Sequence, residues 1–385
     1  MLPAKDSPGT SRGGDFRDLP GQARPRRGDP CGRPIIARRG RGTGRGGATP
    51  ARVRRRRFGP LACALALGAL SVLPAWSDYW TRPEVGDYID GLVVDHALDR
   101  DWLIRAFRGA VKSDDVIRKI SKPAEKALAW HEYRAIFLTD KRIDGGVEFW
   151  QAHRDALDAA TRRFDVPSEI IVAIIGVETF YGRYLGTHRV IDALSTLAFD
   201  YPPRSAFFKS ELTQFLLLAR EEGKDPLEPV GSYAGAMGYG QFISSSYRHY
   251  SVDFDGDGRR DIWTNKTDAI GSVANYFARH GWRGRNDPAV RVEIGDERVL
   301  KVADAGLELA HTVGELRALG AVVPDRVADD EKAALFTMGL ADGSEYWLGL
   351  HDFYVITRYN RSALYALAVL QLSEAIGSRL RAAGG

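Results

Sequence analysis

The stretch "AIIGVETFYGRYLG", residues 173–186, carries a single carboxylate at the end of an apolar run. The run begins at Ile170 and continues to the residue before Glu178. Residues three, four and seven apart share one face of a helix, so Glu178 falls on the stripe of Ile171 and Ile174. The pattern predicts a buried helix with an acidic side chain on its core-facing side.

The position of Glu178 favours a raised pKa of its carboxyl group. Desolvation by the core face, the neighbouring Phe180 and Tyr181, and the negative end of the helix dipole all disfavour the charged form. A carboxyl group that stays protonated near neutral pH can act as a general acid. A structural glutamate paired with a cation such as Arg183 is the alternative that this segment leaves open.

A second segment, "GSYAGAMGYGQF" at residues 231–242, mixes small residues with polar and aromatic ones. Its glycines and alanines leave the backbone little covered, so a ligand could approach it closely. Ser232, Tyr239 and Gln241 add hydrogen-bonding groups and an aromatic face, which suit a sugar. The same composition fits a tight helix-packing loop, so the segment alone does not specify binding.

The two segments, in this order and spacing, resemble the lytic murein transglycosylase B family, a lysozyme-like group of glycosidases. Five ordered blocks carry the resemblance: "GVETFYGRYLG", "VIDALSTLAFDYPPR", "GSYAGAMGYGQFISSSYRHYSVDFDGDG", "DAIGSVANYFARHGW" and "YWLGLHDFYVITRYN". It implies a mainly α (α+β) fold, with a lysozyme-like catalytic core, an EF-hand-like loop and a small α+β insertion.

The resemblance also implies a reaction, cleavage of the β-1,4 bond between N-acetylmuramic acid and N-acetylglucosamine in peptidoglycan. Glu178 would protonate the leaving oxygen and then act as base, so that the muramyl 6-hydroxyl forms a 1,6-anhydro end. A hydrolase normally uses two carboxylates. Asp192 and Asp200 are candidates for a second one, but both also fit helix caps or turns. A hydrolytic muramidase and an inactive glycan-binding protein of the cell wall remain the alternatives.

The substrate contacts are implied by the same resemblance. Ser232 and Gln241 match contact positions of the glycine-rich segment, and Arg204 matches the second Arg of the family's "YPRR" segment. The first Arg of that segment is replaced here by Pro203. For the aromatic matches, ordinary core packing is the alternative. The further expected contacts are Tyr133, Tyr239, Tyr276, Tyr359, Asn360 and Tyr365.

The stretch "DFDGDGRRDIWT", residues 253–264, has the spacing of an EF-hand loop. Hard oxygen donors at this spacing predict a structural Ca²⁺ ion rather than a transition metal. The carbonyl of Arg259 fits position 7, Thr264 replaces the usual Glu at position 12, and the resemblance implies that Asp268 closes the site. A solvated acidic turn without metal is the alternative. Positions 1, 3, 5, 6 and 9 are Asp253, Asp255, Asp257, Gly258 and Asp261.

The first 77 residues form an expected leader. They hold 16 Lys and Arg residues and 4 acidic ones, which leaves 38 basic against 46 acidic residues in the rest of the chain. That balance does not favour nucleic-acid binding. Residues 1–52 are rich in Arg, Gly and Pro and predict disorder. Residues 53–77 combine an arginine cluster, an apolar run and a small-residue exit, as in a signal peptide.

The leader predicts an exported, periplasmic protein with no membrane span after cleavage, because its apolar run is too short for one. An N-terminal membrane anchor is the alternative, and we expect translation to begin near Val53. The cysteines, Cys31 and Cys63, both lie in the leader, and their positions argue against a disulfide and a lipoprotein. Peptidoglycan glycan strands are the expected partner, with other cell-wall enzymes as a second class.

Periodicity and turn signals divide the remaining chain into parts. Strands are expected around 290–294 and on both sides of the Asp342–Gly343 turn, and Thr312 with Glu315 forms a capping box. Asp268 can cap the helix that stops at Gly281. The parts are an N-terminal helical region (78–165), the catalytic core (166–287), the α+β subdomain (288–357) and a C-terminal helix that returns to the core (358–385).

Overall fold

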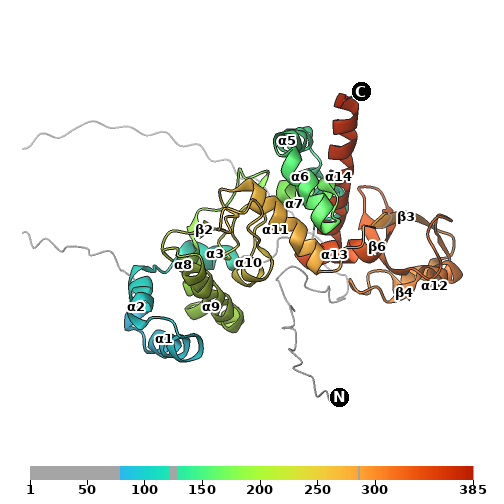
Figure 1. Cartoon of the computed structure of the whole chain (residues 1–385). Helices are drawn as coiled ribbons and strands as arrows, with labels where there is room; N and C mark the ends of the chain where they lie inside the picture. Colours follow the sequence, from blue (N-terminus) through green and yellow to red (C-terminus); the bar gives the residue numbers. More distant parts are fainter. Residues whose placement is uncertain (1–78, 122–127, 285–286, 385) are drawn as a thin grey trace, which may run out of the picture. The chain divides into compact units, whose positions relative to one another are not determined.

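The computed structural model describes residues 79–121, 128–284 and 287–384, and Figure 1 shows their arrangement. They are mainly helical with a small sheet, which confirms the expected fold class. The expected leader, residues 1–77, lies outside the described residues. In the part of the chain that the structure describes, no helix is both long enough and apolar enough to cross a membrane.

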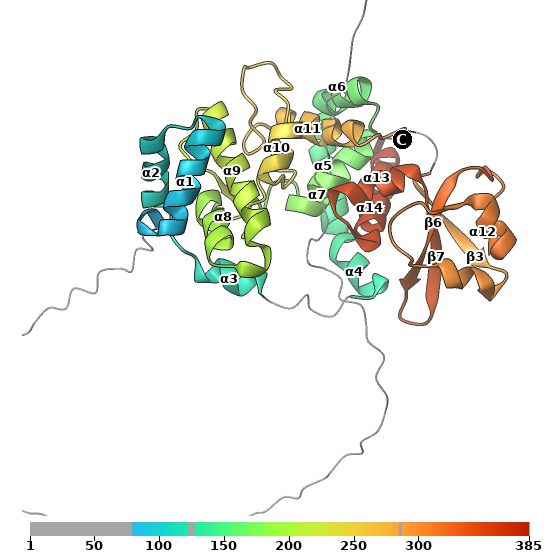
Figure 2. The ribbon, with the colours of Figure 1, turned by 90° about the horizontal axis from the view of Figure 1, so that it is seen from below.

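A first group of helices, which we call the N-terminal cluster, packs segments from two regions of the chain. Helix α2 buries Leu103 and Phe107 and is capped by Asp99, whose side chain accepts the Trp102 N–H at 2.6 Å. This face packs with apolar residues of α8 and α9 in one core, and Figure 2 shows α1 and α2 on one side of α8 and α9. The members are α1 (Pro83–His96), α2 (Arg100–Gly109), α3 (Asp114–Ile120), α8 (Val190–Phe199) and α9 (Ser205–Glu221).

A second group, the central cluster, surrounds α7 (Ser168–Thr179). The residues of α7 from Ile170 to Ile175 have exposed fractions of 4% or less, so this middle part of the helix is buried on every side. An apolar surface of this kind stabilises the fold by removing area from water. The other helices of this cluster are α4 (Trp130–Phe137), α5 (Asp140–Ala152), α6 (Arg154–Phe164), α11 (Lys266–Arg279), α13 (His351–Tyr359) and α14 (Ala363–Gly384).

A five-stranded antiparallel sheet follows α11. Its order is β4-β6-β7-β3-β5, and β6 and β7 form the expected hairpin, closed by Leu340 N–H to Gly343 O at 3.0 Å. Helix α12 (Val313–Leu319) has the expected capping box between Thr312 and Glu315. The strands are β3 (Ala289–Ile294), β4 (His311–Thr312), β5 (Ala321–Val322), β6 (Lys332–Gly339) and β7 (Ser344–Gly349).

The sheet is covered on both faces, because its side chains alternate along each strand. Ala333 and Leu335 of β6 pack with α12, whereas Phe336 and Met338 belong to the central cluster. The sheet is therefore attached to the helices through one of its faces.

The glycine-rich segment lies where the two helical clusters meet. Met237 and Phe242 belong to the N-terminal cluster, and Tyr239 between them belongs to the central cluster. The segment follows a two-residue pairing of β1 (His188–Arg189) with β2 (Val230–Gly231) and precedes α10 (Ser244–Tyr250). It is positioned by residues of both clusters.

The clusters do not follow the expected parts of the chain everywhere. Helices α1 to α3 of the range 78–165 join the N-terminal cluster, whereas α4 to α6 of the same range join the central cluster. The last helix, α14, packs against α7 and α5. The boundaries given above stay predictions.

Candidate active site

Glu178 lies in the last turn of α7, above a fully buried floor. Ile171, Ile174 and Ile175 share its face of the helix, and each has an exposed fraction of 0%. The hydroxyl of Tyr365, on α14, donates a hydrogen bond to Glu178 Oε1 at 2.5 Å. Desolvation raises the pKa of Glu178 to about 7, although the Tyr365 hydrogen bond acts in the opposite direction.

Four tyrosines from four different helices surround this carboxyl group. Its charge raises the pKa of each phenol, in addition to the larger effect of burial. For Tyr133 the result is a pKa of about 12, and the other three are raised further. All four are neutral donors near pH 7. They are Tyr133 on α4, Tyr276 on α11, Tyr359 on α13 and Tyr365 on α14.

The hydroxyl groups of these tyrosines have separate partners. Tyr359 donates to the carbonyl of Gly240 at 2.6 Å, and Tyr276 donates to the carbonyl of Arg358 at 2.6 Å. The rings of Tyr276 and Tyr359 lie 4.7 Å apart. Tyr359 thus connects the site to the glycine-rich backbone, and the hydroxyl of Tyr365 is the one that reaches the carboxyl group of Glu178.

The chain leaves α7 through three consecutive residues with positive φ: Phe180 (51°), Tyr181 (60°) and Gly182 (89°). This conformation is costly for residues other than glycine. Thr179 supports it, because its hydroxyl oxygen accepts the Gly182 N–H at 3.0 Å. The sequence gives no signal for the two non-glycine residues, since their conformation depends on the packing around them.

Thr179 also joins α7 to the glycine-rich segment. Its hydroxyl group lies 3.1 Å from the carbonyl of Tyr239 and can donate to it or to Ile175 O within the helix. The side chain is 1% exposed, so water does not compete for this bond. Thr179, the residue after Glu178, therefore holds the end of α7 next to Tyr239. The sequence patterns did not predict this role.

The polar side chains of the glycine-rich segment organise its own backbone. Gln241, itself at a φ of 49°, donates from Nε2 to Gly238 O at 3.0 Å and to Leu185 O at 3.4 Å. The Ser232 hydroxyl accepts the Ala236 N–H at 3.0 Å. Tyr239 is 8% exposed. Their expected contacts with substrate stay predictions.

The structure places Arg204 and Asn360 at the ends of short elements. Arg204 ends a 3₁₀-helix (Pro202–Arg204), and its guanidinium lies 4.4 Å from the ring of Phe207. Asn360 follows α13 with an exposed side chain, directly after Tyr359. Neither description links Arg204 or Asn360 to Glu178. The expected roles of both residues in substrate binding stay predictions.

The candidates for a second carboxylate are occupied by structural partners. Asp192 accepts from Arg189 Nε at 2.7 Å and from the Val111 N–H at 2.8 Å. Asp200 accepts from the Tyr79 hydroxyl at 2.7 Å and pairs with an arginine of the N-terminal region at 3.1 Å. Both carboxylates hold the N-terminal cluster together.

The alternative of an ion pair between Glu178 and Arg183 is not what the structure shows. Arg183 is exposed, and its guanidinium lies 4.9 Å from the centre of the Phe180 ring. The partner of the carboxyl group is the neutral Tyr365. Because no cation pairs with the Glu178 carboxylate here, desolvation is the main influence on the pKa of Glu178.

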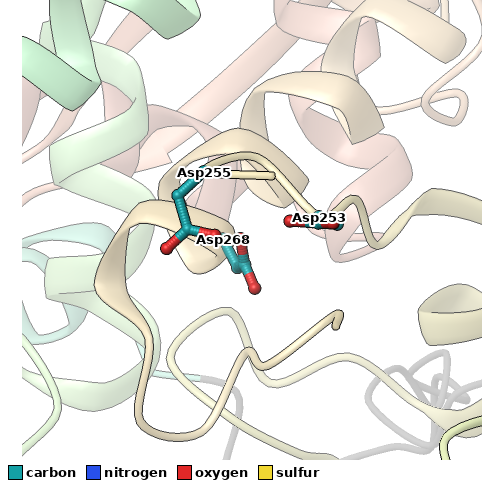
Figure 3. A group of neighbouring side chains, drawn as sticks. All are labelled: Asp253, Asp255 and Asp268. Carbon is teal, nitrogen blue, oxygen red and sulfur yellow. The ribbon is translucent and has the colours of Figure 1, made fainter. Parts of the chain in front are cut away.

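Two aspartates of the acidic loop (residues 253–264) converge with Asp268, as Figure 3 shows. Asp253 and Asp255 come from the loop and Asp268 comes from α11; their ligand atoms lie within 4.8 Å of one another. Oxygen donors of this kind suit a hard cation such as Ca²⁺. Asp257 is outside this group of three, and its carboxylate accepts the Arg259 N–H at 2.8 Å. The structure therefore brings together three of the expected side-chain ligands.

The expected cap of α11 is wrong. Asn265 caps this helix by accepting the Thr267 N–H at 3.0 Å. Asp268 lies one turn further along, fully buried, and accepts the N–H groups of Phe254 at 2.7 Å and Asp261 at 2.8 Å. It connects the two sides of the acidic loop because it faces the loop rather than the helix end.

Known proteins match this chain along most of its length. The transglycosylase SLT domain family matches residues 82–374. The membrane-bound lytic murein transglycosylase B of Escherichia coli K12 is 42% identical over 315 residues, which are 80% of this chain and 86% of that protein.

Solved structures agree with this match. Catenated lytic transglycosylase SltB1 from Pseudomonas aeruginosa is 49% identical, with a TM-score of 0.77 over 79% of this chain and all of that one. Escherichia coli Slt35 in complex with calcium is 41% identical, with a TM-score of 0.73 over 79% and 96% of the two chains. Pseudomonas aeruginosa SltB3 in complex with NAG-anhNAM-pentapeptide is 30% identical, with a TM-score of 0.68 over 76% and 78%.

The family match extends over the helices that carry Glu178, its four tyrosines and the acidic loop. The chain therefore belongs to the transglycosylase SLT domain family and is a lytic transglycosylase.

Proposed function

We propose that this enzyme cleaves the bond between N-acetylmuramic acid and N-acetylglucosamine in peptidoglycan, with Glu178 as its single general acid and base. The observation that carries the proposal is the partly buried position of Glu178 above an apolar floor, where desolvation raises its pKa to about 7. At neutral pH a substantial fraction of the enzyme then holds the proton that a leaving oxygen needs.

In the first step, Glu178 donates its proton to the glycosidic oxygen, and the bond from the muramyl anomeric carbon to that oxygen breaks. In the second step, the carboxylate accepts the proton of the muramyl 6-hydroxyl, and that oxygen bonds to the anomeric carbon. The proton lost in the first step is regained in the second. No water is consumed, and the product ends in a 1,6-anhydromuramyl residue.

Tyr365 and the apolar floor shift the pKa of Glu178 in opposite directions, and each direction suits one of the two steps. Desolvation favours the protonated form that starts the reaction, and the Tyr365 hydrogen bond favours the carboxylate that completes it. A general acid and base that must alternate between two forms works best with a pKa near the working pH.

Within the described chain, the pKa of Glu178 carries no contribution from a second carboxylate, which supports an internal nucleophile. Retaining hydrolases hold their two carboxyl groups about 5–5.5 Å apart and inverting ones about 6.5–9.5 Å apart. Charges at those separations in a buried site would raise the pKa of Glu178 further. Asp192 and Asp200 are instead paired with arginines.

We also propose that Asp253, Asp255 and Asp268 hold a structural Ca²⁺ ion, supported by their convergence and by the calcium complex of Slt35. The ion would offset the repulsion among these carboxylates. The backbone of this loop also connects to the site, because the Ile262 carbonyl accepts the Tyr239 N–H at 3.0 Å. Asp257 and the carbonyl of Arg259 are proposed as further ligands.

The natural substrate of this reaction is a wall polymer, so we propose a periplasmic location, consistent with the apolar run in residues 53–77. Peptidoglycan glycan strands are the proposed partner. The NAG-anhNAM-pentapeptide bound to SltB3 contains the kind of end that our mechanism forms.

Digestion of purified peptidoglycan in ¹⁸O-labelled water, followed by mass spectrometry, tests the reaction type. We expect muropeptides that are lighter by one water than reducing-end products and that contain no ¹⁸O. Reducing ends that carry one ¹⁸O atom would identify a hydrolytic muramidase. An absence of cleavage together with retention on the glycan would identify a binding protein.

A further inference from the structure

A row of aromatic and cationic side chains starts beside Glu178 and leads to the surface. Its first member, Tyr133, is close enough for the Glu178 charge to raise its pKa. The ring of Phe137 lies 5.2 Å from that of Tyr133. The Arg142 guanidinium then lies 5.0 Å from Phe137 and 4.8 Å from Phe180. The row joins α4 and α5 to the segment that follows α7.

Tyr184 is the outer end of this row. Its ring stacks on Phe180, with centres 6.2 Å apart and planes inclined by 25°. Its side chain is 70% exposed, the highest value among the exposed aromatic residues of the described chain. The ring therefore stacks on Phe180 while most of the residue stays exposed to solvent.

The backbone fixes the position of this exposed ring. The Tyr184 N–H donates to the carbonyl of Thr179 at 3.0 Å, directly after the catalytic residue. The positive φ angles of Phe180 and Tyr181 create the tight turn that makes this bond possible. A strained turn that presents an aromatic ring to solvent is a feature expected at a binding site.

The neighbouring contacts strengthen the turn. Arg142 donates to Ile136 O at 2.9 Å, and its own carbonyl accepts the Tyr181 hydroxyl at 2.8 Å. Arg183 covers Phe180 at 4.9 Å. The side chain of Tyr184 is therefore presented by a rigid support, which reduces the entropy lost when a ligand binds.

We infer that Tyr184 is an accessory sugar-binding residue, on which a sugar ring of the glycan strand stacks at a distance from the bond that is cut. A sugar presents C–H groups on one face of its ring, and an open aromatic face is the matching surface. The inference rests on the proposed function, because the strand has to pass Glu178 to reach Tyr184.

The test compares steady-state cleavage of long, soluble, uncross-linked glycan strands and of a murein tetrasaccharide. For Tyr184→Ala we expect KM on long strands to rise about 3- to 10-fold, the range of an aromatic stacking contact, while kcat falls less than 2-fold. The rise in KM on the tetrasaccharide is expected to be smaller, because a short substrate does not reach the outer ring. Tyr184→Phe and Tyr184→Trp should restore the KM on long strands, since both keep an aromatic face.

Trp80→Ala is the matched control, because Trp80 is also an exposed aromatic (41%), and its ring faces Arg108 instead of the site. A KM on long strands that is the same for Tyr184→Ala and Trp80→Ala would overturn the inference. Equal rises in KM on both substrates would also overturn it, because they would mean that Tyr184 acts on Glu178 itself.

A binding measurement separates this inference from the proposed function. If the wild-type protein cleaves neither substrate, the proposed reaction fails. Co-sedimentation of Glu178→Gln and Glu178→Gln/Tyr184→Ala with insoluble peptidoglycan then decides the role of Tyr184. Weaker retention of the double variant supports the sugar contact, and equal retention overturns it.

Discussion

Glu178 carries two opposing influences on its pKa, and they have different origins in the sequence. Desolvation comes from its own helix, where Ile171, Ile174 and Ile175 exclude water from one side. The hydrogen bond that acts in the opposite direction comes from Tyr365, which lies 187 positions further along. The first influence is local and the second requires the complete fold.

The pH dependence of activity follows from this balance. In the proposed mechanism the reaction starts from protonated Glu178, so activity should fall as the pH rises through about 7. Tyr365→Phe removes the bond that lowers the pKa, so the pKa should rise and the alkaline limb of log kcat/KM should move up by about one pH unit. Steady-state rates between pH 5 and pH 9 measure the shift.

Tyr276→Phe is the matched control for that profile. Its hydroxyl donates to Arg358 O and not to Glu178, so its loss should leave the alkaline limb in place. A limb that moves to lower pH in Tyr365→Phe, or that moves equally in both variants, would contradict the assignment of Glu178 as the acid.

At the scale of elements, the end of α7 is where the site is assembled. The helix ends one residue after Glu178, and Thr179 connects it to both the Gly182 turn and Tyr239. The loop that follows then reaches the glycine-rich segment through Gln241. The position of the Glu178 carboxyl group thus depends on two segments that meet at one buried hydroxyl group.

Thr179→Val removes this hydroxyl group at nearly constant volume. The Tyr239 carbonyl and the Gly182 N–H lose their partner, so the free energy of unfolding should fall by about 1–3 kcal/mol. The kcat should fall by up to about 100-fold, since small displacements of a catalytic group are costly. Thermal denaturation and steady-state kinetics measure the two effects.

The control is Thr357→Val, which removes a buried hydroxyl that donates to Tyr354 O within α13. It should also lower the stability, with less than a 3-fold change in kcat. If the two variants lost activity equally, a general loss of stability would explain both, and the role of Thr179 would be contradicted.

The local elements were predictable from the sequence, because their signals are contained in a few neighbouring residues. The α7 stripe, the Thr312–Glu315 capping box and the hairpin at Gly343 are of this kind. The cap of α11 was predicted wrongly as Asp268, because Asn265 and Asp268 are both good caps and the acidic loop decides between them. The left-handed conformation of Phe180 depends on packing that no local pattern reveals.

At the scale of the whole described chain, the four tyrosines around Glu178 come from helices spread between α4 and α14. The resemblance to the family identified these residues, whereas periodicity alone could not separate them from ordinary core residues. The division of α1 to α6 between two clusters was also beyond the sequence, because both groups of helices have similar apolar faces. The acidic loop contacts the site through Tyr239, so its stability affects more than the loop.

Calcium should therefore stabilise the protein. We expect saturating Ca²⁺ to raise the melting temperature, by an amount that corresponds to about 2.7 kcal/mol at 100 times Kd. Asp255→Asn should lose most of this increase, because the substitution removes a proposed ligand. Its cost to the fold should be small, since Asp255 is exposed. Differential scanning calorimetry with EDTA, Ca²⁺ or Mg²⁺ measures it.

Asp342→Asn changes an exposed aspartate in the β6–β7 hairpin and should keep the full response to Ca²⁺. Equal responses in Asp255→Asn and Asp342→Asn would contradict the proposed site. A wild-type melting temperature that does not respond to millimolar Ca²⁺ would contradict it as well.

The most direct test of the account is the turnover of Glu178→Gln on purified peptidoglycan beside the wild-type protein. Glutamine keeps the shape of the side chain and an oxygen that can accept from Tyr365, but it has no proton to donate. We predict normal folding, retained binding to peptidoglycan and a loss of turnover of at least about 1000-fold, because neither step has its acid or base. Cleavage by Glu178→Gln at more than a tenth of the wild-type rate would contradict the central claim.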